Sequence, residues 1–276
     1  MDQGALDAAA GRARLLDELA VAATIAPDQE RIAGWWCKAA PELPFRRCNA
    51  VLPSLGAGGD AEACRAALDV VRGWYDARGL RLIVQVSEAD PTVEALDHLL
   101  ATEGLRIEAP VHVLARSIDG RRTDGSGPSP TSVGSVHVVA GIDEEWAGSY
   151  GRLHGGDERQ QERTAAYGRM LRAHGEHALG ASLAIDGEVV GVGFGVVDRG
   201  WVGIYGMATA PTRRRRGVAT AVLGALQAAA WQAGATSSYL LVEVDNGPAL
   251  GLYRQLGFAR SHGYHYRSSA EAGDRA

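Results

Sequence analysis

The chain has 276 residues, of which 46% are hydrophobic and 22% are charged, so it can form one large or two modest domains with buried cores. Its formal net charge of -5 gives no overall attraction to nucleic acid or anionic lipid. No apolar stretch approaches the roughly 20 residues of a membrane span, and no basic segment precedes an apolar run near the start. We therefore expect no membrane helix and no signal peptide.

The first half is predicted to begin with a helix and to continue through alternating strands and helices. Apolar periodicity predicts a helix over 5–23, an extended region over 35–53, a helix over 61–77, a strand over 81–86, a helix over 92–102 and a strand over 107–116.

A linker is predicted next, because residues 120–134 are rich in Gly, Ser, Pro and Thr and have no apolar periodicity. The second half then reads as a strand over 135–140, helices within 144–173, strands over 181–186, 189–197 and 201–208, a helix over 217–233, a strand over 238–244, a helix over 247–256 and a strand over 261–266.

The two halves share one order of elements, which indicates a degenerate internal repeat. The alternative is that any two strand–helix–strand segments look alike at this level. We expect an N-terminal domain over 1–119, a linker over 120–134, a C-terminal domain over 135–267 and a disordered tail over 268–276.

Three cysteines, Cys37, Cys48 and Cys64, form no CxxC pair. An odd number of thiols without metal-ligand spacing favours reduced, buried cysteines over a disulfide or zinc framework. We therefore expect a cytoplasmic protein without a metal.

The run Arg213 to Arg216 lies directly before the predicted helix that starts at Gly217. Cations oppose the dipole at a helix N-terminus, so a bound phosphate or pyrophosphate is the natural compensation. A P-loop is excluded because the GxxxxGK[ST] lysine is absent. Arginine runs also form nucleic-acid faces, but this run is short and isolated in an acidic chain, which favours the anion site.

Three linked motifs follow one another in this region. Arg214-x-x-Gly217-x-Ala219 is followed by Val244-Asp245-Asn246 and by Leu252-Tyr253-x-x-Leu256-Gly257-Phe258. Together they resemble the acetyl-CoA-binding core of the GNAT (Gcn5-related) N-acetyltransferase superfamily, over roughly 131–267. The resemblance implies an α/β (α+β) chain of tandem GNAT-like folds, each a mixed, mostly antiparallel sheet flanked by helices. The first half is similar to a degenerate copy, as in some actinobacterial acetyltransferases that include mycothiol synthase-like enzymes.

The resemblance also implies a set of residues that bind acetyl-CoA. Arg214 belongs to the pyrophosphate motif, whose amides are those of Arg215, Arg216, Gly217, Val218, Ala219 and Thr220. The pantetheine arm is expected to pair with the backbone of Met207, Ala208 and Thr209, where the sheet splays open, and to contact Asn246.

Two residues are the candidates for proton transfer. By resemblance, Tyr253 protonates the departing thiolate as general acid, although an aromatic residue on such an apolar helical stripe is also a core residue. Glu243 is the first candidate for the general base because it follows an apolar strand. Strand alternation leaves open whether its side chain faces the site or solvent.

The corresponding loop of the first half lacks these features. Asp60 and Glu62 occupy its helix start, where they satisfy the dipole and repel a pyrophosphate, and Leu100 takes the position of Tyr253. We therefore expect no acetyl-CoA site in the first half. In the second half, Gly191, Gly193 and Gly195 leave one sheet face bare, either for tight helix packing or for a groove.

These features predict an acetyl-CoA-dependent N-acetyltransferase that acts on a primary amine of a small molecule or peptide by direct attack on the thioester. The alternative is a non-catalytic acyl-CoA-binding sensor or partner module, and a nucleic-acid role of the arginine run comes third. No nucleic-acid or membrane partner is expected, and a homodimer is left open.

Overall fold

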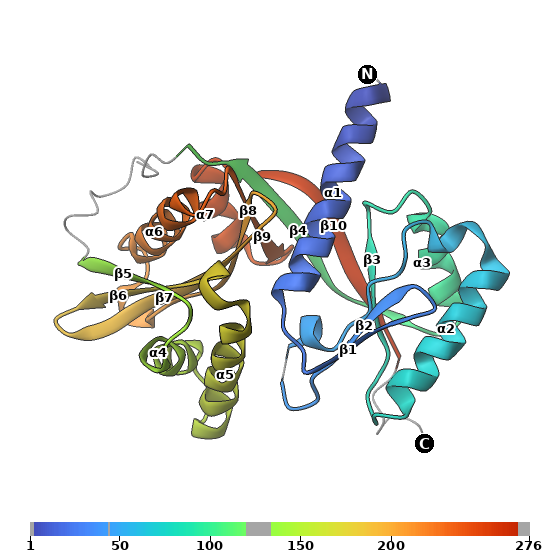
Figure 1. Ribbon diagram of the computed structural model, residues 1–276, viewed down its shortest axis with the longest axis horizontal. Helices are drawn as coiled ribbons and strands as arrows, with labels where there is room; N and C mark the ends of the chain where they lie inside the picture. Colours follow the sequence, from blue (N-terminus) through green and yellow to red (C-terminus); the bar gives the residue numbers. More distant parts are fainter. Residues whose placement is uncertain (1–2, 44, 120–133, 270–276) are drawn as a thin grey trace. The chain divides into compact units, whose positions relative to one another are not determined.

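The chain folds into two compact units (Figure 1). The computed structural model describes residues 3–43, 45–119 and 134–269. The first unit comprises Met1–Val113, Val242–Asn246 and Arg260–Ala276, and the second comprises Leu114–Leu241 and Gly247–Ala259. The predicted linker lies outside the described residues except for Gly134, and so does the predicted tail beyond residue 269.

The first unit places its strands against two amphipathic helices. Its elements are α1 (Gln3–Ala23), β1 (Asp28–Ile32), β2 (Trp35–Ala39), α2 (Ala61–Asp76), β3 (Ile83–Ser87), α3 (Val93–Thr102), the first residues of β4 (Arg106–Ser117) and most of β10 (Ala259–Ser268). β1 and β2 pair as an antiparallel hairpin. β10 lies between β3 and β4 and runs antiparallel to β3. The core joins the inner faces of α2 and α3 to β2 and β3, with Leu68, Leu100 and Val84 fully buried.

Three details of this unit differ from the sequence expectations. The polar strand β1 was not predicted, because its residues DQERI show no apolar alternation. Residues 260–267, expected in the C-terminal domain, belong to the first unit, where β10 pairs with β3 from Tyr264 to Ser268. Ser268, expected in the disordered tail, is the last residue of β10, where its hydroxyl donates to Glu108 at 2.5 Å. The pairing of β10 with β3 could not be predicted from local sequence, since the two strands are distant along the chain.

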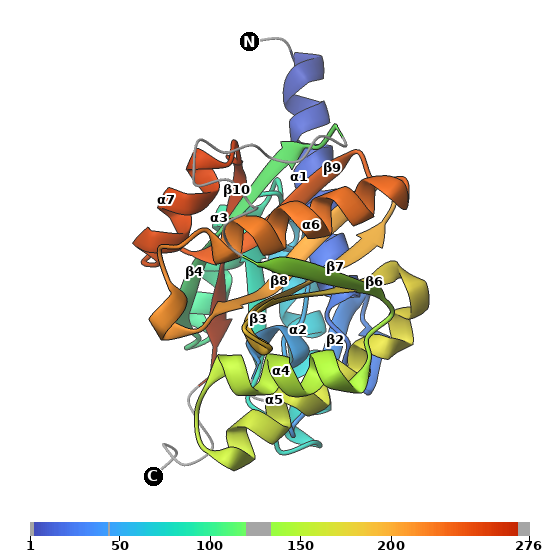
Figure 2. The same ribbon diagram turned by 90° about the vertical axis from the view of Figure 1, so that its left-hand side faces the viewer.

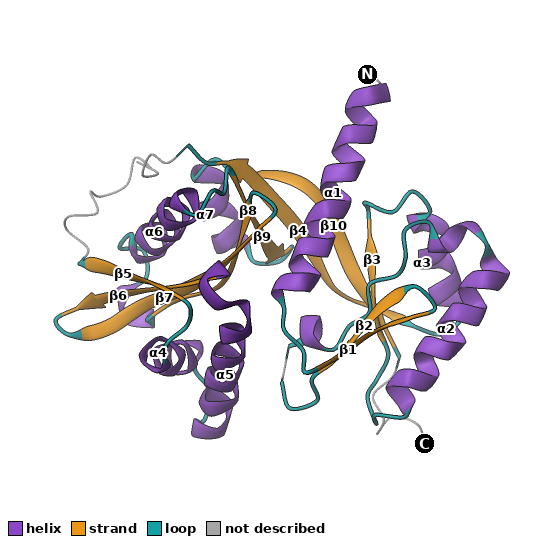
Figure 3. Cartoon of the chain, in the orientation of Figure 1, coloured by secondary structure: helices purple, strands orange, loops and turns teal. Residues whose placement is uncertain are grey.

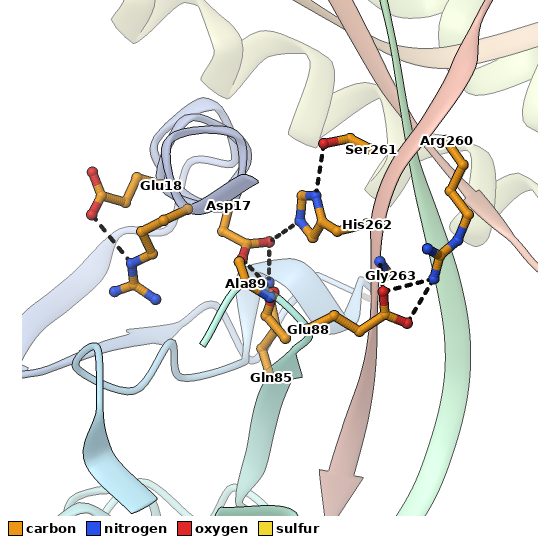
Figure 4. Close-up of polar contacts among 11 residues, drawn as sticks. Asp17, Glu18, Gln85, Glu88, Ala89, Arg260, Ser261, His262 and Gly263 are labelled. Carbon is orange, nitrogen blue, oxygen red and sulfur yellow. Dashed lines mark hydrogen bonds and ion pairs between the residues drawn. The ribbon is translucent and has the colours of Figure 1, made fainter. Parts of the chain in front are cut away.

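Three elements of the first unit, α1, β3 and β10, meet at a buried carboxylate (Figure 4). Asp17 of α1 is 1% exposed and accepts hydrogen bonds from Gln85 at 3.1 Å and Ser87 at 2.5 Å on β3. His262 Nε2 of β10 lies 3.1 Å from the same carboxylate. Because a buried carboxylate without donors is costly, these contacts fix α1 on β3 and β10.

The second unit is a sheet covered by helices on both faces (Figures 2 and 3). Its elements are β5 (Ser135–Ala140), α4 (Glu144–His154), α5 (Glu158–Met170), β6 (Ala178–Ile185), β7 (Glu188–Asp198), β8 (Trp201–Thr209), α6 (Val218–Gln232), most of β9 (Ser237–Glu243) and α7 (Gly247–Gln255). The strand order is β9-β8-β7-β6-β5, antiparallel throughout except for β8 and β9, which are parallel. This mixed, mostly antiparallel sheet agrees with the predicted fold class.

The glycine stripe of β7 is explained by helix packing. A Cβ atom at Gly191 would collide with Val218 of α6, and one at Gly193 would meet Val222 at 3.2 Å. The bare face of the sheet is therefore covered by α6. This contact supports the interpretation as tight helix packing and not the interpretation as a groove. The three cysteines are buried and free. Among the described residues, no helix combines the length and the apolarity that a membrane crossing requires.

Candidate functional site

The parallel pair β8 and β9 separates partway along its length. Their ladder runs from Trp201 opposite Ser237 to Ile204 opposite Leu240 and ends there, although β8 continues to Thr209. Gly206 has φ of +58°, and the pairing of β8 with β7 shifts register at this point. A left-handed residue in a strand is a β-bulge that only glycine adopts without strain. The bulge and the strand separation form the predicted splay.

Beyond the bulge, β8 offers backbone groups at its open edge. The amide of Ala210 donates to Val190 of β7 at 2.8 Å, and Ala208 lies opposite Val192 in the same ladder. Because backbone groups of a strand alternate in direction, Met207 and Thr209 direct theirs to the other side, where β9 has ended its pairing. Of the three residues expected to pair with a pantetheine arm, Ala208 is therefore engaged with β7, and its two neighbours face the open edge.

The loop between β8 and α6 ends in two left-handed residues. Arg215 has φ of +61° and Gly217 has φ of +79°, and Gly217 is the N-cap of α6 without any side-chain hydrogen bond. The first backbone bond of α6 joins the amide of Ala221 to the carbonyl of Gly217 at 2.9 Å. The amides of Val218, Ala219 and Thr220 therefore have no acceptor inside the helix. Such a run of convergent amides is suited to an anion.

The arginines before α6 differ in their surroundings. Arg213 lies 4.0 Å from Asp186, whereas Arg214, Arg215 and Arg216 are exposed and make no ion pair within the described ranges. No acidic residue occupies the first turn of α6. Three unneutralised guanidinium groups therefore surround amides that already favour negative charge.

Tyr253 lies on α7, packed into the core of the second unit. Its side chain is 8% exposed, and its ring meets that of Phe258 edge-on at 5.8 Å. Burial raises the pKa of Tyr253 to about 12. The sequence Leu-Gly-Phe after it is a helix C-cap: Gly257 has φ of +82°, and the amide of Phe258 donates to the Tyr253 carbonyl at 3.0 Å. The motif thus has a structural role besides any chemical one.

Glu243 and Asn246 belong to the first unit and are exposed. Glu243 has 57% of its side chain exposed and lies 3.9 Å from Arg46. Of the two orientations that strand alternation left open, the side chain therefore has the solvent-facing one. Asn246 closes a turn through its amide, which donates to the Glu243 carbonyl at 3.1 Å, and it directly precedes α7.

Sequence reasoning gave little weight to the aromatic face opposite α6. Tyr205 and Tyr239 meet through their hydroxyls at 2.6 Å directly over Gly203. Phe194 stacks on Tyr205 with a centroid distance of 5.3 Å and faces Tyr150 of α4 at 6.0 Å. Gly203 and Gly206 were the sequence signal for this aromatic face, because both lie beneath these rings, where a side chain would collide with them. Among the described residues, no group of three His, Cys, Asp or Glu side chains could hold a metal ion.

The first unit repeats this geometry without the anion site. Val51 forms a parallel bridge with Val84, as β8 does with β9, and the amide of Leu105 donates to the Leu100 carbonyl at 3.0 Å, as Phe258 does to Tyr253. The N-terminus of α2, however, is capped by Asp60, which accepts from the amides of Glu62 at 3.0 Å and Ala63 at 3.1 Å. Its amides are therefore already occupied.

Comparison with known families now identifies the chain's relatives. Residues 11–267 match the family model described as "Probable histone acetyltransferase Rv0428c C-terminal". The chain belongs to this family. Membership supports an acetyltransferase activity in general terms, and the fold is that of GCN5-related N-acetyltransferases. A search of curated proteins finds no match.

Solved structures share the fold at low sequence identity. A GCN5-related N-acetyltransferase from Kribbella flavida is 18% identical, with a TM-score of 0.69 over 96% of this chain and 98% of that chain. A tandem GNAT protein from the clavulanic acid biosynthesis pathway is 15% identical, with a TM-score of 0.60 over 75% of this chain and 69% of that chain. A GCN5-related N-acetyltransferase from Sphaerobacter thermophilus is 20% identical, with a TM-score of 0.54 over 80% of this chain and 72% of that chain.

Proposed function

We propose that the second unit is an acetyl-CoA-dependent N-acetyltransferase, which transfers the acetyl group to a primary amine of a small molecule or peptide by direct attack on the thioester. The observation that carries this proposal is the uncapped N-terminus of α6, where Gly217 takes a left-handed conformation beside three unpaired arginines. A pyrophosphate is the acyl-CoA group that suits such amides and charges.

The residues near this terminus fit the rest of the coenzyme. Ala219 is small enough for close approach, and Met207 and Thr209 offer backbone groups at the open edge of β8 to an amide-containing arm. Asn246 is proposed to contact the same arm, on the family resemblance. When bound, acetyl-CoA supplies the activated acyl group.

Tyr253 is proposed to stabilise the departing sulfur. With a pKa raised to about 12, its phenol stays protonated at neutral pH. That value lies above the pKa of a thiol, about 8.5. Full transfer of the phenol proton to the coenzyme thiolate is therefore unfavourable at this pKa of Tyr253. The phenol therefore acts first as a hydrogen-bond donor to the sulfur. Glu243 is the general base predicted from the sequence.

Titration calorimetry with acetyl-CoA tests the anion site. The triple substitution of Arg214, Arg215 and Arg216 to Ala is expected to weaken affinity by about 10-fold to 100-fold, the effect of losing about one hydrogen bond to a charged group, about 1.5–3 kcal/mol. Arg199→Ala is the matched control, because Arg199 is exposed at a turn of the same unit, 3.5 Å from Asp198. Unchanged affinity of the triple variant would overturn the proposed site.

Thiol release from acetyl-CoA tests the chemistry. The wild type is expected to release thiol with at least one member of a panel of small amines and lysine-containing peptides, and Tyr253→Phe to do so at least about 10-fold more slowly. Coenzyme binding without transfer to any amine, or equal background rates in both proteins, would instead favour the acyl-CoA-binding module.

A further inference from the structure

His154 ends α4 with its ring against that of Tyr150, at an interplanar angle of 51°. The two ring centroids are 4.2 Å apart, and Nδ1 of His154 lies 2.9 Å from the carbonyl oxygen of Tyr150. A carbonyl oxygen only accepts hydrogen bonds, so Nδ1 must carry the hydrogen. In the neutral imidazole this leaves a lone pair on Nε2. The helix therefore selects the tautomer in which the outer nitrogen is basic.

Tyr150 connects this ring to the bulge of β8. A Cβ atom at Gly206 would lie 2.5 Å from Cε2 of Tyr150, so the phenol ring rests directly on the bulge. Phe194 meets Tyr150 on the same face of the sheet, opposite α6. Gly206 precedes Met207, the first residue proposed to pair with the pantetheine arm. Tyr150 thus links the His154 ring to the point where the open edge of β8 begins.

The charged residues next to His154 in the chain are engaged elsewhere. Arg152 on the same helix donates to Ser149 at 2.8 Å, and Asp157 caps α5 through the amide of Gln160 at 2.8 Å. β7 and β8 present Phe194 and Tyr205 to this side, and His154 forms no ion pair within the described residues. His154 is exposed, and burial of part of its ring lowers its pKa below the usual value, opposed by the hydrogen bond to the Tyr150 carbonyl. A lowered pKa favours the neutral ring.

We propose that His154 is the proton acceptor of the acetyl transfer, an inference that rests on the proposed function. The amine nitrogen forms a bond to the acetyl carbonyl carbon, and the bond from that carbon to sulfur breaks. Nε2 of His154 takes the proton that the nitrogen loses, and the coenzyme leaves as a thiolate hydrogen-bonded to Tyr253. Imidazolium and thiolate then exchange one proton through solvent, which restores the enzyme.

A measurement without turnover tests the tautomer. Long-range nitrogen–proton correlation spectra of the full chain labelled at histidine are expected to show neutral His154 with its hydrogen on Nδ1. His177 is the control because it is exposed in the same unit, as His154 is, and each signal is assigned from its His→Gln variant. A hydrogen on Nε2, or a charged His154 at pH 7, would overturn the proposal even in an active enzyme.

Kinetics test the role itself, with acetyl-CoA and an amine that the wild type accepts. His154→Gln is expected to lower kcat about 100-fold or more, to leave acetyl-CoA affinity unchanged and to abolish the acidic limb of the pH–rate profile. Added imidazole should restore part of the rate of His154→Ala, whereas His177→Gln should match the wild type.

Two results would overturn the role of His154 alone. One is a His154→Gln enzyme that keeps the wild-type rate and acidic limb, and the other is loss of that limb in Glu243→Gln instead. A wild type that binds acetyl-CoA but acetylates no amine contradicts the proposed function itself, and the role of His154 with it.

Discussion

Gly217 and Arg215 hold the loop before α6 in the left-handed region, and this conformation aims the amides of the helix outward. A side chain in that region costs about 1–2 kcal/mol. We therefore expect Gly217→Ala to lower the free energy of unfolding by about 1 kcal/mol and to weaken acetyl-CoA binding. Gly73→Ala, within α2 and with no atom within 4 Å of the added Cβ, should instead stabilise the chain by about 0.5–1 kcal/mol. Denaturant titration and calorimetry measure both, and equal effects of the two substitutions would contradict this account.

The contribution of the single residue Lys38 to stability is expected to depend on pH. It is 1% exposed on β2 and donates from Nζ to the carbonyls of Val21, at 2.6 Å, and Thr24, so that it caps the end of α1. Burial lowers its pKa to about 8. Between pH 8 and the unfolded value near 10.4, the unfolded chain binds a proton that the folded chain does not, so this residue's contribution to stability rises with pH.

The unfolding free energy of the wild type relative to Lys38→Met is therefore expected to increase by on the order of 2–3 kcal/mol from pH 8 to pH 10.5. Ionisation of the tyrosines and of the other two thiols is common to both proteins and cancels in the difference, whereas the Cys48 thiol interacts with Lys38 and is replaced by Ser in both proteins for this measurement. A difference that is flat or falls over this window would show that the ammonium group is not desolvated as the structure implies.

Two helices at equivalent places in the two units, α2 and α6, differ in how their N-termini are capped. α2 is capped by the Asp60 side chain, whereas α6 has no cap and no acidic residue in its first turn. Asp60→Ala should lower the free energy of unfolding by about 1 kcal/mol, since it removes a helix cap, and should leave coenzyme affinity unchanged. Thermal denaturation and calorimetry check the pair of results. A second coenzyme site appearing in this variant would mean that the cap alone had blocked binding.

The whole molecule is accordingly expected to bind one acetyl-CoA per chain. Its first unit repeats the strand and helix geometry of the second, but Leu100 replaces the phenol of Tyr253, and Asp60 occupies the helix amides. Calorimetric titration should give a stoichiometry of one. Two equivalent sites per chain would contradict the division of roles between the units.

Most elements could be predicted from the sequence because local patterns specify them. The helix at α6 and the strand at β5 follow from apolar periodicity, and Gly257 marks the end of α7 through its left-handed conformation. β1 escaped prediction because polar residues on a short hairpin carry no periodic signal. The solvent orientation of Glu243 also escaped, since alternation states that neighbours differ in direction but not which face is covered.

By itself, the sequence determined the fold class and predicted the repeat and the anion site at the turn before α6, because glycine, arginine and helix-start chemistry act within a few residues of the chain. Only the tertiary structure decided that β10 completes the first unit, that α6 covers the bare face of β7, and that His154 contacts Tyr150, whose ring lies on the bulge. These outcomes depend on contacts between distant segments, whose geometry is set by packing of the complete core.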